Sequence, residues 1–290
     1  FGQLMLAFIQ FGFQSSIGLS LIGESTVSVD SLTTAKNVFL GQTLLRPYGT
    51  FVHPNIFAAF VLFAFLLVEF FILDEEKGRC SYAAHSLFRL LVFLLLFLLA
   101  SRSALLAFAL YLLINFEAKS FSIKSFSRKI PQFFTLAILL LVFFSFLALL
   151  PRAGIQERLE LMGISIRMFF DFPFGVGFGG FTKYIQLFSD SALRPWEFHP
   201  VHNVFLLLLN EFGVLCFSLF GFLTVRAFFR KRAELLLGKY YRFFLGLVVV
   251  LAVLMSFDHF LFSLYQGQML LAFFIVLAVL IGRKGLFVTV

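Results

Sequence analysis

The residues that could do acid–base chemistry gather in a polar segment in the second half of the chain. His199 and His202 stand close together near its end, and Asn203 follows just inside an apolar run. Histidine changes charge near neutral pH, so it can take a proton from a hydroxyl with little tuning. We therefore expect His202 to act as a catalytic base, with Asn203 beside it in the substrate site. Capping of a helix at the membrane interface is the structural alternative for His202.

Two arginines are candidates for binding an anion. Arg102 lies between two apolar runs, where a lone charge is costly unless it pairs with another group or reaches water. Arg158 lies near the start of an amphipathic pattern that runs from Ile155 to Phe172. Because a guanidinium offers a bidentate fork to phosphate, Arg102 is predicted to contact an anionic substrate, and simple anchoring at the membrane interface is its structural alternative.

The pattern over Ile155–Phe172 predicts one amphipathic helix that ends before a proline. At about 100° per residue, Arg158 and Arg167 fall on opposite faces of such a helix. We expect Arg167 to pair with Asp171 one turn later. A salt bridge to a neighbouring glutamate, such as Glu157, is the structural alternative for Arg158.

The glycine-rich stretch GVGFGG follows this helix and includes Gly175 and Gly177. Its spacing departs from the dinucleotide-binding pattern, and no Lys-Ser/Thr pair follows as a phosphate-binding loop requires. We predict a turn in which Gly175 and Gly177 let the backbone approach a substrate.

A metal site is not expected from the sequence. His199 and His202 have a spacing that could place two ligands together, but no third ligand is evident. The two cysteines of the chain form no C-x-x-C pair. We therefore predict no metal and no cofactor.

The composition indicates what must position these residues. The chain is 61% hydrophobic and 13% charged, and its charged fraction is well below that of a typical soluble domain. We expect an all-α, polytopic helical membrane protein of about eight spans, forming one membrane domain over residues 1–290. The expected spans are Gly2–Ile22, Ile56–Leu73, Leu87–Ala100, Ala104–Phe116, Phe133–Leu150, Val201–Leu223, Phe243–Phe257 and Tyr265–Ile281. We also expect the chain to begin inside a helix and to lack upstream spans.

The net charge of +8 does not indicate nucleic-acid binding, because the basic residues lie in short loops between apolar runs. Positively charged loops stay on the cytoplasmic side of a membrane. This rule predicts that the loop at residues 151–200 faces outward, and that Arg46 and Arg102 do so as well.

Four stretches together resemble the O-antigen ligase and O-antigen polymerase superfamily, and the resemblance covers essentially the whole chain. Gly213–Cys216 follow His202-Asn203 at the spacing of the ligase pattern, although Cys216 departs from its last position. The four stretches are LLRPYGTFVHPN (Leu44–Asn55), SRSALLAF (Ser101–Phe108), ERLELMGISIRMFFDFPFGVGFGGF (Glu157–Phe181) and HPVHN (His199–Asn203).

The resemblance implies transfer of a glycan from an undecaprenyl-diphosphate carrier to an acceptor hydroxyl at the outer face of the bacterial inner membrane. It implies that Arg102 and Arg158 engage the diphosphate, that His202 assists the acceptor, and that Arg46 belongs to the substrate site. The expected partners are the lipid-linked donor, membrane lipid, and a glycan, lipid or protein acceptor. Polymerase, ligase and protein O-glycosyltransferase remain open, and the alternative is a transporter or flippase for a lipid-linked saccharide.

Overall fold

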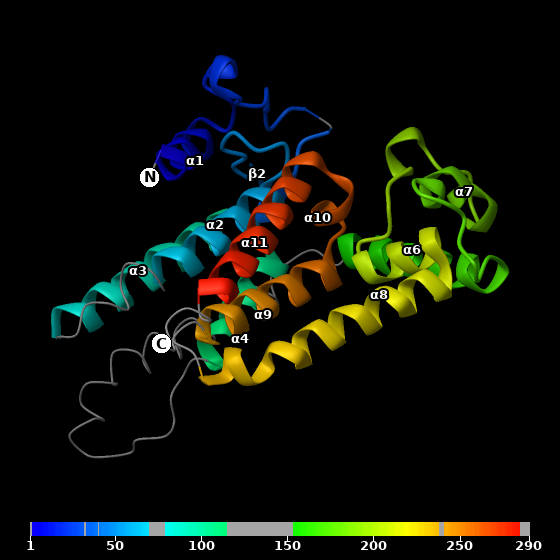
Figure 1. The fold of residues 1–290 in the computed structure, drawn as a ribbon. Helices are drawn as coiled ribbons and strands as arrows, with labels where there is room; N and C mark the ends of the chain where they lie inside the picture. The colour runs from blue at the N-terminus through cyan, green and yellow to red at the C-terminus, as the bar shows by residue number, and fades with distance from the viewer. Residues whose placement is uncertain are drawn as a thin grey trace. The chain divides into compact units, whose positions relative to one another are not determined.

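The computed structural model describes residues 2–31, 33–39, 41–69, 79–114, 153–237 and 241–284 (Figure 1). The chain divides into two compact units, and each unit combines separate stretches of sequence. The first unit is Phe1–Pro151 with Leu245–Val253, and the second is Arg152–Phe244 with Leu254–Val290. The predicted span Phe133–Leu150 lies outside the described residues.

The first unit opens with helix α1 (Gly2–Phe13), which is shorter than the expected span Gly2–Ile22. The helix ends where Gln14 takes a left-handed conformation with φ 55°, and a short 3-10 turn, η1 (Ser20–Ile22), follows. Strands β1 (Lys36–Phe39) and β2 (Gln42–Leu45) then form an antiparallel hairpin. The all-α prediction missed this hairpin.

A buried glutamine ties α1 to the segment after it. The Gln10 amide oxygen accepts hydrogen bonds from the backbone N–H groups of Tyr48 (2.9 Å) and Gly49 (2.8 Å). Its amide nitrogen donates to Glu24 Oε1 at 2.8 Å and to the Gly49 carbonyl at 3.1 Å. Because each polar atom of this buried side chain has a partner, Gln10 fixes the N-terminal helix without an unsatisfied group.

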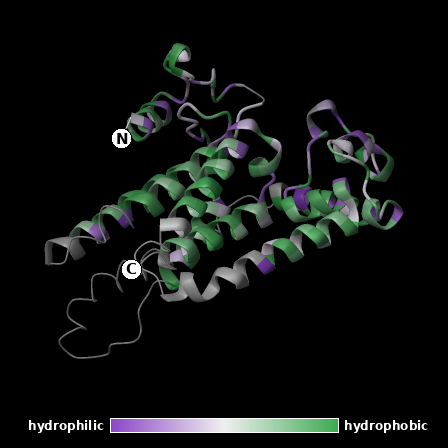
Figure 2. Ribbon diagram, in the orientation of Figure 1, coloured by the Kyte–Doolittle hydropathy of each residue, from purple (hydrophilic) through white to green (hydrophobic). Residues whose placement is uncertain are grey.

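Three apolar helices form the main body of the first unit: α2 (Pro54–Val68), α3 (Arg79–Leu98) and α4 (Arg102–Ile114). They pack against one another, and Figure 2 shows α2 coloured hydrophobic along most of its length. The ring of Phe65 lies at their centre, 5.0 Å from the Phe108 ring and 5.1 Å from the Tyr111 ring. Helix α2 starts cleanly because the His53 side chain accepts a hydrogen bond from the Asn55 N–H.

The second unit contains α6 (Ala153–Asp171), α7 (Gly180–Phe188), the 3-10 turn η3 (Pro195–Glu197) and α8 (Val204–Leu237). Helix α9 (Tyr241–Phe257) leads into a tight turn, after which come α10 (Phe260–Ser263) and α11 (Tyr265–Lys284). The core of the unit joins α6, α7 and the start of α8, and its buried members are Leu161, Ile164, Met168, Phe181, Ile185, Val201 and Leu207. The helix predicted at Ile155–Phe172 is confirmed as α6.

The prediction of about eight membrane spans is wrong. Among the described residues, one helix is long and apolar enough to cross a membrane, the Val204–Arg226 part of α8. The apolar parts of the other helices, such as Ala84–Leu98 of α3 and Tyr265–Leu280 of α11, are 10–17 residues long. A 15-residue helix such as α2 reaches about 22 Å, which is less than the roughly 30 Å of a hydrocarbon core. The expected span Gly2–Ile22 shows one reason, because the left-handed Gln14 ends α1 well before that apolar run is over.

Candidate functional site

The site forms where the segment before α8 meets the turn between α9 and α10. Asn203 caps α8, since its side-chain oxygen accepts a hydrogen bond from the Leu206 N–H at 2.9 Å. Its amide nitrogen donates to the Ser256 carbonyl at 3.0 Å. Asn203, rather than His202, therefore performs the capping role, and it holds the preceding residues against the α9–α10 turn.

His202 pairs with a buried carboxylate. Its Nδ1 lies 3.5 Å from Asp258 Oδ1, and the backbone N–H of His259 donates to the same oxygen at 2.8 Å. Since a carboxylate only accepts, Nδ1 of His202 carries the proton and Nε2 is the basic nitrogen. The His202 side chain is 22% exposed and the Asp258 side chain 6%.

The neighbours of Asp258 keep its carboxyl group ionised. Burial alone would raise its pKa, but the hydrogen bond from His202 and the nearby positive charges hold that pKa well below its usual range. An ionised carboxylate behind the ring fixes the tautomer and stabilises the imidazolium that forms when Nε2 takes a proton. The arrangement is that of a histidine base with an orienting acid.

A second pair lies beside the first. His199 Nε2 is 2.9 Å from Glu157 Oε1, which joins the segment before α8 to α6. The hydrogen bond to Glu157, opposed by burial and helped by the Pro200 carbonyl, raises the pKa of His199. The same hydrogen bond lowers the pKa of Glu157. The raised pKa keeps more of His199 protonated near neutral pH, and Glu157 and the Pro200 carbonyl occupy both of its ring nitrogens, so His199 is less available to take a proton.

A third histidine completes the cluster. The His259 ring lies 5.1 Å from the His202 ring, which is 5.2 Å from the His199 ring. Burial lowers the pKa of His259 to about 4, although Asp258 opposes the shift. Its Nδ1 lies 2.5 Å from Ser263 Oγ. His259 is thus neutral at physiological pH, and each of the three rings offers a nitrogen within 4.8 Å of the other two.

Arg158 adds a positive charge to this site. Its Nη1 donates to the Phe257 carbonyl at 2.5 Å, directly before Asp258 in the chain. The guanidinium lies close enough to lower the pKa of both Asp258 and Glu157. Arg158 and His202 thus both lie near Asp258, and the hydrogen bond of Arg158 goes to the Phe257 carbonyl rather than to a neighbouring glutamate.

Arg167 lies away from this cluster, as the helical geometry predicts. It donates to the Phe188 carbonyl at 2.6 Å and lies 3.5 Å from Asp190 Oδ2, so its partner is Asp190 rather than Asp171. Two other predicted residues belong to the first unit. Arg102 is the first residue of α4, and Arg46 donates to the Leu99 carbonyl (2.8 Å) and to Asn55 Oδ1 (2.6 Å).

The two predicted glycines lie against a break in α8. Gly213 interrupts that helix with φ 76° and ψ 170°. The freed Val214 N–H donates to the Pro173 carbonyl at 2.8 Å, and the Gly177 N–H donates to the Glu211 carbonyl at 3.0 Å. A Cβ on Gly175 would lie 2.6 Å from that same Glu211 oxygen. The backbone of this turn therefore does make a close approach, but it approaches the backbone of α8.

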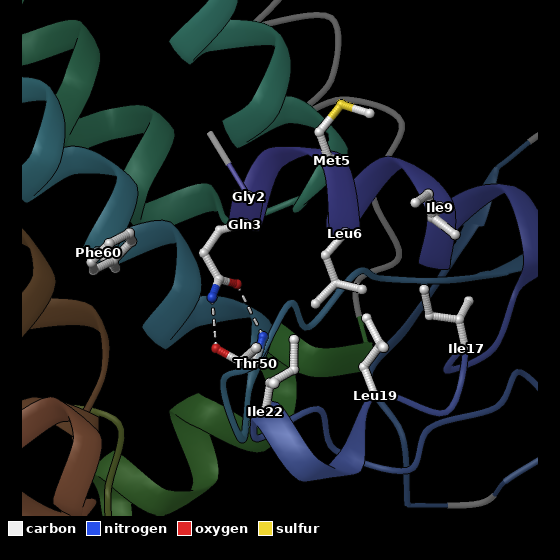
Figure 3. A pocket seen from close by; sticks show the side chains of 10 residues that line it. All are labelled: Gly2, Gln3, Met5, Leu6, Ile9, Ile17, Leu19, Ile22, Thr50 and Phe60. Carbon is white, nitrogen blue, oxygen red and sulfur yellow. Dashed lines mark hydrogen bonds between the residues drawn. The ribbon is translucent and has the colours of Figure 1, made fainter.

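A separate hollow lies in the first unit, between α1 and the segment that follows it (Figure 3). Its volume is about 470 Å³. The lining is largely apolar and has no ionisable side chain: Gly2, Gln3, Met5, Leu6, Ile9, Ile17, Leu19, Ile22, Thr50 and Phe60. Across it, the Gln3 amide nitrogen donates a hydrogen bond to the Thr50 hydroxyl at 2.7 Å. The hollow can hold an apolar group, but it offers no acid–base chemistry.

Sequence reasoning missed Ser256, at the end of α9, and Asp258 and His259, in the turn that follows, because all three lie far along the chain between two apolar runs. The available signal was the adjacent Asp-His pair, since an ionisable pair within such an apolar region is costly unless it is used. Comparison of the sequence and fold with family models, curated proteins and solved structures finds no match.

Proposed function

We propose that the protein transfers a glycan from a lipid-linked diphosphate carrier to an acceptor hydroxyl at a membrane surface. The observation that carries the proposal is the ring of His202, half-buried and paired with the buried carboxylate of Asp258, with Arg158 beside it. The substrate class comes from the resemblance of the sequence motifs to the O-antigen ligase and polymerase superfamily.

The geometry supports a proton transfer at Nε2 of His202. As the acceptor oxygen bonds to the anomeric carbon, its proton moves to Nε2 and the bond from that carbon to the diphosphate oxygen breaks. Asp258 stabilises the resulting imidazolium, which returns its proton to solvent. General-base assistance of this kind is typically worth about 10²–10⁴ in rate.

The departing diphosphate gains negative charge as the glycosyl bond breaks. Arg158 uses one N–H on the Phe257 carbonyl, and a guanidinium has about five N–H donors in all. A fixed cation stabilises the developing charge more than the ground state, which is what accelerates the reaction. Arg158 is therefore the residue of this cluster that we assign to the diphosphate.

The test is to incubate the purified full chain with a polyprenyl-diphosphate-linked oligosaccharide and a hydroxyl acceptor, measuring donor binding and glycan transfer separately. His202→Ala should lower transfer by about 10²–10⁴ while donor binding persists. His199→Ala is the matched control and should lower transfer less, because Glu157 occupies Nε2 of His199 and keeps more of its ring protonated. Normal turnover by His202→Ala would show that another group activates the acceptor.

Transport of a lipid-linked saccharide is the second candidate, and one observation favours it. The one described helix that is both long and apolar enough to cross a membrane is broken at Gly213, close to the acidic residue Glu211, and interrupted helices are common at transporter sites. Transport would move the donor across a vesicle without cleaving it, so the chemical state of the donor after incubation separates the two functions.

A further inference from the structure

We propose that His199, His202 and His259 form a binding site for Zn²⁺, and that bound zinc switches off the catalytic base. Three of the five histidines of the chain meet here, although they come from two distant stretches. One nitrogen from each ring lies within 4.8 Å of the other two. The inhibitory part of the proposal rests on the function proposed above, whereas the binding part does not.

The chemistry of the three ligands favours zinc. Neutral imidazole suits Zn²⁺, and three protein ligands with a fourth position for water is a common zinc arrangement. Zn–N bonds of about 2.0–2.1 Å require nitrogen separations of roughly 3.4 Å in a tetrahedron. Small rotations of these partly buried rings would bring the three nitrogens from within 4.8 Å of one another to that separation.

The groups behind the rings already have the arrangement of a second shell. Asp258 accepts from Nδ1 of His202, and Ser263 contacts Nδ1 of His259, so Nε2 of both rings is left for a metal. Zinc-binding histidines usually hold a carboxylate, carbonyl or similar partner through the other ring nitrogen, which fixes the ring and strengthens the ligand. His199 is held by Glu157 through Nε2 and by the Pro200 carbonyl through Nδ1. One of these contacts gives way when His199 binds the metal.

The consequence for catalysis follows from the lone pair of His202. Nε2 of His202 has one lone pair, and it cannot both bind Zn²⁺ and accept the proton of a hydroxyl. Zinc would therefore compete with the proton transfer, and the metal-free protein would be the active form. Glycan transfer should then withstand treatment with EDTA and fall when zinc is added.

The binding test uses Zn²⁺ alone with the purified full chain, measured by calorimetry, and Co²⁺ as a spectroscopic probe of tetrahedral coordination. The wild type should bind one Zn²⁺ per chain. His259→Ala should lose this binding, Asp258→Asn should weaken it about 10–100-fold as removal of a second-shell partner does, and His85→Ala, a histidine of the first unit, should bind as the wild type does. No binding by the wild type, or the same loss with His85→Ala, would overturn the site.

The inhibition test compares glycan transfer with and without Zn²⁺ within each variant. The wild type and His85→Ala should lose transfer in zinc and regain it after EDTA, whereas the ratio for His259→Ala should stay near one. Zinc bound to the wild type with transfer unchanged would overturn the inhibitory role. Because calorimetry needs no donor, a protein that binds zinc but transfers no glycan would overturn the proposed function and leave the site standing.

Discussion

At the scale of single residues, the site shows how a neighbour decides what a histidine can do. His199 and His202 have the same type and nearly the same place in the sequence, but Glu157 holds the first and Asp258 the second. The sequence predicted His202 as the base, and its resemblance to the superfamily implied that Arg158 contacts the diphosphate. It could not predict Asp258 or His259, because their approach depends on how the α9–α10 turn folds back.

The two arginines of α6 give a direct test of the proposed donor site. Arg158→Ala should lower both donor binding and glycan transfer, because its guanidinium is the cation of the histidine cluster. Arg167→Ala should be much milder, since that side chain is exposed and bonds to Phe188 and Asp190. Donor affinity and turnover on both variants provide the measurement, and equal losses would contradict the assignment. Arg158→Lys should restore transfer only in part, because an ammonium lacks the fork.

Glu24 provides a test of pH dependence that is independent of the site. Burial would raise its pKa, but hydrogen bonds from Gln10 and from the Ile17 and Leu19 N–H groups lower it below the ordinary 4.5. A lowered pKa means that Glu24 stabilises the fold above the unfolded-state pKa, and that this contribution is lost as the pH falls through the folded-state value.

Thermal unfolding of the wild type and of Glu24→Gln at a series of pH values measures this contribution. The wild type should be the more stable protein at neutral pH, and the difference should shrink as the pH falls below about 4.5. Subtracting the variant removes the effect of other titrating groups. A difference that does not change with pH would show that Glu24 acts through its shape rather than its charge.

At the scale of elements, the sequence predicted helices better than it predicted their ends. The amphipathic period was sufficient to predict α6, because the apolar side of this helix is buried against α7 and α8. The hairpin of β1 and β2 was missed because strands of four residues each are too short for an alternating pattern to stand out in the sequence. The break in α8 was missed because a lone glycine in an apolar run is also compatible with an uninterrupted helix.

The break in α8 can be tested with a glycine of the same helix as its control. A Cβ on Gly213 would lie 2.2 Å from the Phe174 carbonyl carbon, at a φ of 76°. Gly213→Ala should therefore lower the free energy of unfolding by more than the roughly 1–2 kcal/mol that a left-handed conformation alone costs a residue with a Cβ. At Gly221 an added Cβ meets nothing within 4 Å, so Gly221→Ala should be neutral or stabilise the helix by roughly 0.5–1 kcal/mol.

Thermal or denaturant unfolding of the two variants gives the comparison. Gly175→Ala should behave like Gly213→Ala, because it lies on the other side of the same contact. The double variant should lose less free energy of unfolding than the two single variants together, since the first substitution already separates the Gly175 turn from α8. If Gly213→Ala is as stable as Gly221→Ala, the junction contributes nothing to the fold.

At the scale of the whole molecule, composition indicated a membrane protein but overstated how often the chain could cross. The prediction of many crossings rested on the apolar content, which is 61% of the residues and includes 47 phenylalanines in 290 residues. The length of each helix depends on where it begins and ends along the chain, and the composition alone does not give these positions. The described residues keep one helix of sufficient length and apolar character, Val204–Arg226.

Membrane attachment through this helix is the corresponding prediction. Leu215 and Leu219 are 67% and 58% exposed on α8, and a lysine at the centre of a span costs about 2.5–3.5 kcal/mol. Leu215→Lys with Leu219→Lys should release the chain from membranes into alkaline carbonate, whereas the wild type should need detergent. Leu187→Lys on α7, at a position 73% exposed, is the control and should stay attached. Release of the wild type by carbonate would contradict the prediction.

The junction between the glycine turn and the broken helix also constrains how the sequence can vary. Neither Gly175 nor Gly213 has room for a methyl group while the backbone of the opposite segment is in place. A replacement at one position removes the reason for glycine at the other, because the contact that required both is lost. In related sequences we therefore expect these two distant positions to keep glycine together or to lose it together. That paired inheritance would identify chains that share this junction even where little else in their sequences can be aligned.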